Sequence, residues 1–282
     1  MTDADPHLAG IRVYPVKSLD PDPRTRARVL ADGGLTHDRA YAIRDADGRY
    51  VNGKREPAVH GIDATFDPAD HALALRTRSR DRESRPDGAL SATTVSLADE
   101  SGRDAAADWL STYFDYPVTL DHDGTGGFPD DTTAHGPTVV STATLDAIGD
   151  WFDLGTESVR RRFRPTLEIG GVPAFWEDRL YADREHVVRF RIGDAEFLGT
   201  NPCSRCAVPS RDPETGDAIE GFRETFVERR EATRPAWADE AWFDHHYRLA
   251  VNTAVPEATV GATLTVGDAV TVLDVEAGNP QS

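Results

Sequence analysis

The sequence predicts a mainly β protein of the α+β class, with a barrel-rich architecture in two parts that meet near residue 120. Short segments that alternate apolar and polar residues recur along the 282 residues, whereas few segments have the spacing of a helix. Many short strands with few helices favour a barrel-rich architecture. The chain is long enough for two domains, which we place at residues 8–120 and 121–282.

The strand predictions rest on β-rich segments that are bounded by turn residues. Asp47-Gly48 separates two of these segments and predicts a hairpin. Pro15 places the first segment at a sheet edge or a strand end, because proline cannot donate a ladder hydrogen bond. The predicted strands cover residues 11–16, 40–44, 49–51, 62–66, 71–75, 167–169, 186–192, 195–198 and 263–273.

A few segments have helical spacing or loop composition instead. The predicted helices cover residues 105–114, with Asp104 as N-cap, 141–152 and 241–248. Residues 77–88 are charged and without period, which predicts an exposed loop. Residues 120–136 are rich in Asp, Gly and Thr, so we expect a linker or a mobile loop between the domains.

Composition excludes several classes of protein. The formal net charge is −18, which disfavours nucleic acid as a partner, because duplex binding depends on phosphate neutralisation. No run of about 18 apolar residues occurs, so we expect neither a transmembrane helix nor a membrane partner. The polar N-terminus does not resemble a secretory signal, and two cysteines are too few for a disulfide framework, so we expect a cytoplasmic protein. Only two of the 31 basic residues are lysines, which together with the acid content favours adaptation to high salt.

Both cysteines, Cys203 and Cys206, lie three residues apart. Residues 190–198 before them alternate like a strand, and residues 212–217 after them have the composition of a turn. We therefore expect the thiols in a connection just past a strand, where a rigid scaffold presents them. Thiolates are soft metal ligands and good nucleophiles, so this pair marks the place for metal or redox chemistry.

Four interpretations of the cysteine pair are open on the residues alone. A structural zinc site needs about four ligands, and the rings of His245 and His246 cannot both point to one metal from a strand or helix. A thiol–disulfide exchange pair usually opens a helix, but Pro209 and a turn follow here. The cysteines are alternatively buried and unreactive. Finally, one thiolate binds a metal cofactor that brings its own other ligands, which suits a chain with few candidate ligands.

Nine short motifs follow one another between about residue 10 and about residue 275. They are residues 14–18, 34–39, 54–57, 141–145, 162–165, 174–178, 202–206, 212–216 and 266–268. Taken together, this set resembles the MOSC superfamily, the molybdenum cofactor sulfurase C-terminal domain proteins. It is most similar to the branch with an N-terminal β-barrel domain, which includes the mitochondrial amidoxime-reducing component and its bacterial relatives. Thr166 stands where that family usually has Asn.

The resemblance implies a fold, a cofactor and a metal ligand. The implied fold is an N-terminal barrel followed by a MOSC barrel with helices. The implied cofactor is molybdenum bound to molybdopterin, and tungsten would suit the same ligands. By the family's pattern Cys206 ligates the metal, and Cys203 lies nearby without being essential. At the level of the whole superfamily, the resemblance also implies pyridoxal phosphate binding.

Cations that fall within the matched motifs are the implied partners of the cofactor's phosphate. A chain with a net charge of −18 must supply local positive charge to hold that anion. The implied contacts come from Lys17, Ser18, Arg39, Arg55 and Arg164. The other lysine, Lys54, is left open between such a contact and a solvated surface charge.

Three further polar residues have two interpretations each. Ser141 and Thr142 cap the helix that follows them, or they place hydroxyl groups and the helix N-terminus against the cofactor, and both can hold together. Asp178 hydrogen-bonds a pterin edge or forms an ion pair with an arginine.

The resemblance therefore predicts an oxidoreductase that takes a small-molecule substrate. We expect it to reduce N-hydroxylated or N-oxygenated compounds by two-electron oxygen-atom chemistry. The chain lacks the cysteines of an iron–sulfur domain, so the electrons would come from a separate protein. The alternatives are a cofactor carrier without turnover, a sulfur-transfer protein with a persulfide on Cys206, and a structural zinc protein. Residues 218–244 match no motif.

Overall fold

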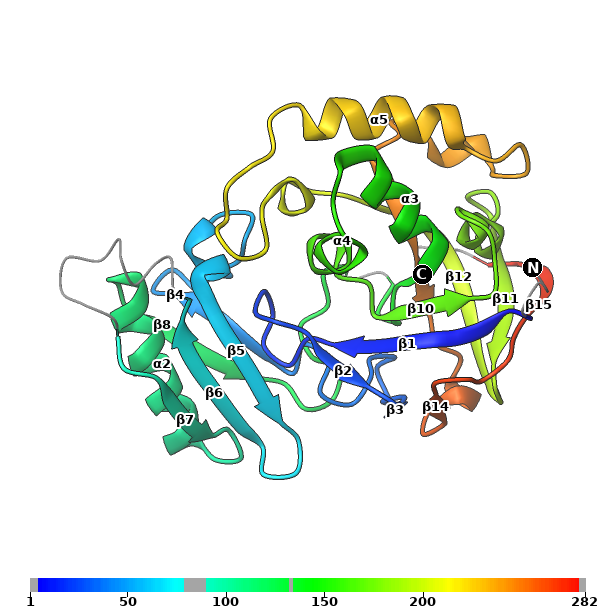
Figure 1. Ribbon diagram of the computed structural model, residues 1–282. Coiled ribbons are helices and arrows are strands. Elements are labelled where there is room, and N and C mark those ends of the chain that lie inside the picture. The colour runs from blue at the N-terminus through cyan, green and yellow to red at the C-terminus, as the bar shows by residue number, and fades with distance from the viewer. Residues whose placement is uncertain (1–4, 79–89, 132–133, 279–282) are drawn as a thin grey trace.

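The computed structural model describes residues 5–78, 90–131 and 134–278, and its largest unit is an eight-stranded sheet (Figure 1). Neighbouring strands are antiparallel except for the parallel pair of β9 (Val139–Ser141) and β10 (Leu167–Gly170). In order across the sheet, the strands are β15 (Val270–Ala277), β11 (His186–Ile192), β12 (Ala195–Ser204), β13 (Arg248–Ala254), β9, β10, β1 (His7–Val13) and β2 (Asp22–Arg24).

The N-terminal strand β1 joins the two halves of the chain. It lies beside β10 in the large sheet, although it belongs to the predicted first domain (Figure 1). Its first residue, His7, also forms a bridge with Ala269, just before β15. The sheet thus curves until β1 and β15 meet at their ends, but the described strands do not close into a barrel, because the two ends share an isolated bridge rather than a continuous ladder.

Among the residues that the structure describes, the first half of the chain adds smaller sheets and one α-helix. The strands are β3 (Arg26–Arg28), β4 (Tyr41–Asp45), β5 (Ile62–Asp67), β6 (Ala72–Thr77), β7 (Thr93–Ser96) and β8 (Val118–His122), with the short 3-10 helix η1 (Pro57–Gly61) and helix α2 (Glu100–Phe114). β4 pairs with β8, and β5, β6 and β7 form a three-stranded sheet. Trp109, Leu110 and Tyr113 of α2 pack into the apolar core between these sheets.

The second half covers the large sheet with helices. These are α3 (Thr142–Phe152), α4 (Thr156–Phe163), α5 (Phe222–Thr233) and the 3-10 helices η2 (Trp176–Leu180), η3 (Val208–Ser210), η4 (Glu240–Trp242) and η5 (Glu257–Thr259). A last short strand, β14 (Thr263–Thr265), pairs with β3. Ile148 of α3, Phe163 of α4 and Phe226 of α5 meet in one core cluster, which fixes the helices to each other.

The predicted fold class is confirmed: the structure is mainly β, with a large sheet and few helices. The Asp47-Gly48 hairpin is present, with a bridge between Arg44 and Tyr50. The helix over residues 141–152 is found as α3 with Ser141 as N-cap. The division at residue 120 stays a prediction, and the loop expected over residues 77–88 lies mostly outside the described residues.

Two helix predictions are corrected. α2 begins earlier than predicted, and its N-cap is Asp99, whose carboxylate accepts from Gly102 N at 2.9 Å, so the proposed cap Asp104 is wrong. No side chain of α2 before Ala106 is buried, so the start of the helix has no apolar spacing from which the sequence could predict it. Residues 241–248 are not a helix: η4 ends at Trp242, and β13 begins at Arg248.

Two strand predictions are also corrected. The strand predicted over residues 195–198 continues to Ser204. The alternation of apolar and polar residues stops at Asn201-Pro202, but backbone pairing with β13 extends the strand beyond this point. Cys203 therefore lies within the strand. Residues 263–273 form two strands, β14 and β15, and the turn between them contains Gly267 at φ 101°.

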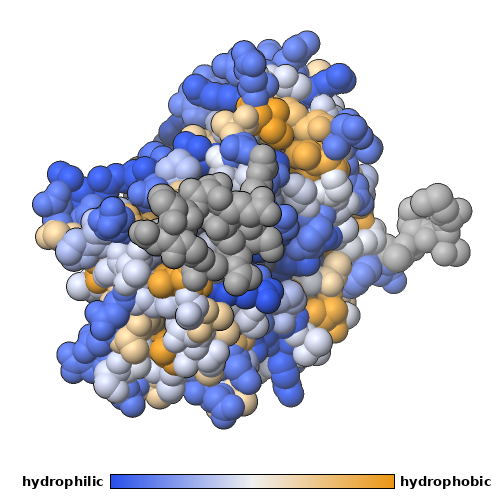
Figure 2. Space-filling model, turned by 60° about the vertical axis from the view of Figure 1, so that its left-hand side comes forward, coloured by the Kyte–Doolittle hydropathy of each residue, from blue (hydrophilic) through white to orange (hydrophobic). Residues whose placement is uncertain are grey.

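Hydrophilic side chains cover most of the face in Figure 2, with hydrophobic residues in small separate patches. Among the described residues, no helix combines the length and apolar character that a membrane span requires.

Gly199→Ala should destabilise the protein by about 1–3 kcal/mol, because a methyl group there enters a closely packed backbone. A Cβ atom at Gly199 of β12 would lie 1.6 Å from the carbonyl oxygen of Leu180. Denaturant unfolding measures the loss. The matched control is Gly155→Ala, where a Cβ meets nothing within 4 Å. Equal unfolding free energies for the two variants would contradict the close packing of β12 against η2.

Candidate functional site

Three arginines hold the end of β12, where the cysteines lie, by donating to backbone carbonyl groups. Arg248 donates to Pro202 O at 3.2 Å, and Arg205 donates to Phe163 O at 3.1 Å and Leu249 O at 3.0 Å. Arg162, which is buried at the end of α4, donates to the carbonyl oxygens of Pro209 and Arg211. The cysteine segment is thus connected to β13 and α4, which positions it against the rest of the second half.

The two thiols differ in their environments. Cys203 is half-buried, and burial raises the pKa of its thiol, although Arg205 opposes the shift. Cys206 follows the strand and is exposed. A soft metal or an electrophile therefore reaches Cys206 more readily, because the thiolate is the reactive form and burial disfavours it at Cys203.

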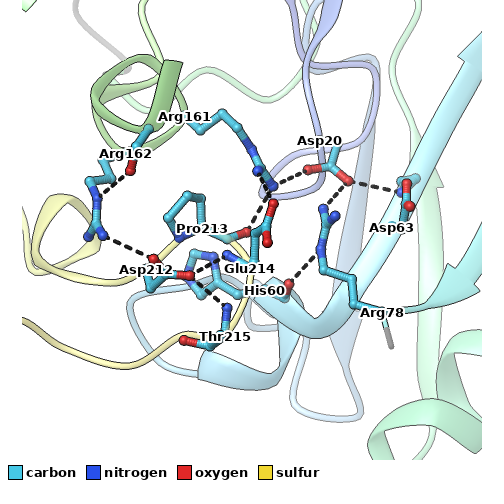
Figure 3. Close-up of polar contacts among 12 residues, drawn as sticks. Asp20, His60, Asp63, Arg78, Arg161, Arg162, Asp212, Pro213, Glu214 and Thr215 are labelled. Atoms are coloured by element: carbon cyan, nitrogen blue, oxygen red, sulfur yellow. Dashed lines mark hydrogen bonds and ion pairs between the residues drawn. The ribbon is translucent and has the colours of Figure 1, made fainter. Parts of the chain in front are cut away.

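The turn after the cysteines is fixed from both sides. Arg162 donates to Asp212 Oδ2 at 3.2 Å, and Asp212 accepts from Glu214 N and Thr215 N at 3.0 and 3.1 Å (Figure 3). These bonds and Arg162 hold the pKa of Asp212 below its usual value despite partial burial. Gly216, at φ 74°, allows the turn to approach η1, since a Cβ there would meet Pro57 O at 2.9 Å.

An ionic network joins the two halves of the chain beside this turn (Figure 3). Asp20 accepts from Arg78 at 2.5 Å within the first half and from Arg161 of α4 at 3.2 Å. Arg161 also donates to Pro213 O at 3.0 Å and pairs with Glu214 at 3.0 Å. The network therefore links the position of the cysteine-proximal turn to the first half.

Lys17 and Arg39, both predicted cofactor contacts, are brought together in the structure. Both are buried, and both pair with Asp130: Lys17 Nζ lies 2.6 Å from Oδ1, and Arg39 Nε lies 3.3 Å from Oδ2. Arg39 also pairs with Asp38 at 2.6 Å. Burial lowers the pKa of Lys17, and Asp130 opposes that shift. Arg39 and Lys17 hold the pKa of Asp130 well below the usual range, against the desolvation that neighbouring residues impose on its largely exposed side chain.

Arg164 joins this cluster through the aromatic ring of Tyr14. Its guanidinium lies 4.0 Å from the ring centroid, and that of Arg39 lies 5.1 Å from the same ring. The residue ends α4 in the left-handed conformation at φ 53°. In the part of the chain that the structure describes, no acidic side chain forms an ion pair with Arg164. Arg164 is half-buried, and partial desolvation lowers its pKa, so this cation is incompletely solvated and has no direct counter-ion among the described residues.

A small cleft lies beside Arg164 at the junction of the two halves. Its volume is about 20 Å³, and it is lined by Ser18, Leu19, Asp20, Pro21, Val59, His60, Ile62, Arg161, Arg164 and Pro213. The predicted contact Ser18 thus lies near Arg164. Burial and the nearby arginines, Arg164 first, lower the pKa of His60 to about 4, so the cleft is positive through its arginines rather than through His60. Neither cysteine lines this cleft.

Ser141 caps α3 inside a buried polar network. Its Oγ accepts from Thr144 N at 3.1 Å, and its backbone N donates to Glu177 Oε2 at 3.2 Å. Thr144 Oγ1 also donates to Glu177 at 2.9 Å. Burial, followed by the charge of Asp178, raises the pKa of Glu177 to about 7. The hydroxyl of Thr142 is buried without a hydrogen-bond partner among the described residues.

The remaining predicted contacts lie apart from the cation cluster. Asp178 is buried and pairs with Arg230 of α5 at 2.6 Å, which is one of the two arrangements we expected. Its carboxylate accepts through both oxygens from one guanidinium nitrogen. Arg55, like Lys54, is exposed, and its charge acts on the pKa of Tyr116.

Sequence reasoning missed two residues that the structure places in the site. Asp130 lies in the segment predicted as a linker. An acidic residue is common in such a segment and does not by itself indicate a role in a site. Tyr247 has a buried hydroxyl group without a hydrogen-bond partner in the described chain, and Cys206 acts on its pKa, which burial raises to about 12. Tyr247 falls in the segment wrongly predicted as a helix.

The described residues contain no cluster of three or more His, Cys, Asp or Glu side chains suited to hold a metal ion.

Comparison with known families agrees with this architecture. The model described as "MOSC N-terminal beta barrel domain" matches residues 6–117, and the model described as "MOSC domain" matches residues 137–271. The two matches cover most of the chain in the order that the motifs predicted. The chain therefore belongs to the MOSC family, with the N-terminal domain that accompanies it in one branch.

Among individual proteins, the chain is similar to mitochondrial amidoxime reducing component 2 of Bos taurus and mitochondrial amidoxime-reducing component 1 of Homo sapiens. The identities are 26% over 239 residues and 25% over 242 residues, covering 72% and 74% of this chain and 66% and 67% of the relatives. Molybdenum cofactor sulfurase of Homo sapiens is 23% identical over 270 residues, covering 80% of this chain but 29% of that protein. The chain thus spans about two thirds of the first two relatives' length and under a third of the sulfurase.

Glu177→Gln should remove a pH-dependent loss of stability. The pKa of Glu177 rises from 4.5 to about 7 in the folded protein, so folding favours the protonated form. The free energy of unfolding should therefore fall as pH rises from about 4.5 to about 7, by roughly 3 kcal/mol. Denaturant unfolding at the two ends of this range measures the fall. It should be smaller in Glu177→Gln, whereas Asp150→Asn, an exposed acid on α3, should keep it. An unchanged fall in Glu177→Gln would contradict the raised pKa.

Proposed function

We propose that this protein binds a molybdenum–pterin cofactor and reduces N-oxygenated small molecules. The family supports a molybdenum-related function, because its named relatives include amidoxime reducing components and molybdenum cofactor sulfurase. The observation that carries the proposal is the cluster of the buried cations Lys17 and Arg39 with the half-buried Arg164. In a chain with a net charge of −18, such a cluster serves best to hold an anion.

The residues present fit an anionic, metal-bearing cofactor. Arg164 is desolvated without an ion pair in the described structure, and it stacks on Tyr14. The hydroxyl groups of Thr142 and Tyr247 are buried and lack hydrogen-bond partners in the residues described. A buried polar group without a partner costs free energy, so these groups are better explained by a ligand that satisfies them.

Cys206 would hold the metal. It is exposed, whereas burial raises the pKa of the Cys203 thiol and disfavours its thiolate. The charges of Asp130 and Asp131 act on the pKa of Cys203 after burial and Arg205, which supports a site that includes both the cation cluster and the cysteines.

The protein's own residues would orient, shield and tune the cofactor. The arginines that donate to the carbonyls of Pro202, Phe163 and Leu249 would hold the thiol at a set position. When bound, the cofactor supplies two-electron oxygen-atom chemistry at the metal. Electrons would come from a separate protein, since the two cysteines leave no set of ligands for an iron–sulfur cluster.

One observation favours a second function, sulfur transfer. Cys206 is exposed, and relatives named molybdenum cofactor sulfurase share 21–23% identity with the chain. A persulfide on Cys206 would then pass sulfur to an acceptor. This function predicts extra mass on Cys206 that a thiol reductant removes, without bound molybdenum.

Cys206→Ala should lose bound molybdenum, whereas Cys203→Ala should retain it. We expect molybdenum per chain to fall by about tenfold or more in the first variant, because one thiolate is the protein's only ligand to the metal. Elemental analysis and pterin fluorescence of protein from a cofactor-producing host measure this. Equal molybdenum in both variants, or none in the wild type, would contradict the assignment of Cys206.

The loaded protein should convert an aromatic amidoxime to the amidine when a chemical reductant supplies electrons. Arg164→Met should bind less cofactor, because the desolvated guanidinium is a primary phosphate contact in this scheme. Product formation per bound molybdenum separates lost binding from lost chemistry. Full loading without turnover of any N-oxygenated compound would favour a carrier over a reductase.

A further inference from the structure

In the part of the chain that the structure describes, the segment over residues 127–130 supplies the acceptors that the Lys17 ammonium group contacts. Nζ donates to Phe128 O at 2.8 Å and Pro129 O at 3.1 Å, and it lies 2.6 Å from Asp130 Oδ1. Three donors thus meet three acceptors from consecutive residues. Lys17 lies four residues after the end of β1, and the segment comes more than a hundred residues later. The contact between them therefore depends on the tertiary fold.

The backbone of the same segment is attached to Arg39. Phe128 N donates to Arg39 O at 2.8 Å, and Gly127, at φ 70°, approaches so closely that a Cβ there would lie 2.7 Å from Arg39 O. The segment is therefore fitted over the cations rather than placed near them by chance. Its carboxylate reaches between the two cations, with contacts to both.

The exposure of the three side chains is unequal. Those of Lys17 and Arg39 are 9% and 10% exposed, whereas that of Asp130 is 67% exposed. The cations are buried and fixed, and the anion sits on the solvent side of them. An anion from solution can therefore take the position of Asp130 without opening the core.

Charge in the cluster does not balance. The cations are Lys17, Arg39 and Arg164, and the carboxylates in contact with them belong to Asp38 and Asp130. Three positive charges thus face two negative charges. A phosphate monoester carries about two negative charges at neutral pH, so replacing Asp130 with it would match three cations with three negative charges.

We propose that Asp130 is an internal counter-ion that occupies the cation site of the empty protein, and that a phosphate group must displace it to bind. The inference rests on the proposed function for the identity of the phosphate, which would be that of the cofactor. It adds that the protein carries a competitor for its own anion site. Asp130 would stabilise the buried cations before loading and would lower the affinity for phosphate.

The test measures binding of inorganic pyrophosphate by calorimetry at fixed ionic strength, which needs no molybdenum. Asp130→Asn removes the competing charge and should bind pyrophosphate about fivefold more tightly or better. Without ligand, the same variant should unfold at a lower temperature than wild type, and pyrophosphate should restore more of its stability. Asp130→Ser provides a second variant with the charge removed. Lys17→Gln should weaken pyrophosphate binding.

Asp108→Asn is the matched control, because it changes the net charge equally at an exposed position on α2. Its pyrophosphate affinity should equal that of the wild type. The proposal is overturned if both Asp130 variants bind no more tightly than Asp108→Asn, or if Lys17→Gln leaves binding unchanged. Absence of pyrophosphate binding in every variant also overturns it. These outcomes are separate from the proposed function, which fails instead through missing molybdenum or missing turnover.

Discussion

A buried guanidinium group needs acceptors on several sides, and this requirement ties the site to the rest of the fold. Arg162 ends α4 and donates into the turn after the cysteines, while Arg205 and Arg248 hold the end of β12 from the other side. Their partners are mostly backbone carbonyl groups, which no side-chain substitution can remove. The cysteine segment thus has a set position although it lies outside regular structure after Ser204.

The cation cluster follows the same rule with one exception. Lys17 and Arg39 have carboxylate partners within the protein, and these ion pairs offset the desolvation cost of burying the two cations. Arg164 has only the face of Tyr14 in the described structure, and a cation over an aromatic ring recovers a small part of what desolvation costs. The protein can fold with Arg164 in this arrangement. A bound anion would stabilise the folded protein further, because it would supply the missing counter-ion.

The two halves of the chain contribute to one site. Lys17 and Arg39 come from the first half and Arg164 from the second, and the Asp20–Arg161 pair joins the halves beside the turn that follows the cysteines. β1 also belongs to the large sheet, so the halves share backbone hydrogen bonds as well as ion pairs. A change in how they pack would therefore move the cations relative to the thiols.

The sequence by itself determined the mainly β class, the helix over residues 141–152 and the family, because each depends on local composition or short motifs. It also singled out Lys17, Arg39 and Arg164 by their motifs. Only the tertiary structure decided that β12 extends through Cys203, that residues 241–248 lead into a strand, and that Asp130 and Tyr247 reach the site. These features depend on pairing and burial between residues distant in the chain, and such contacts leave no periodic signal in the sequence.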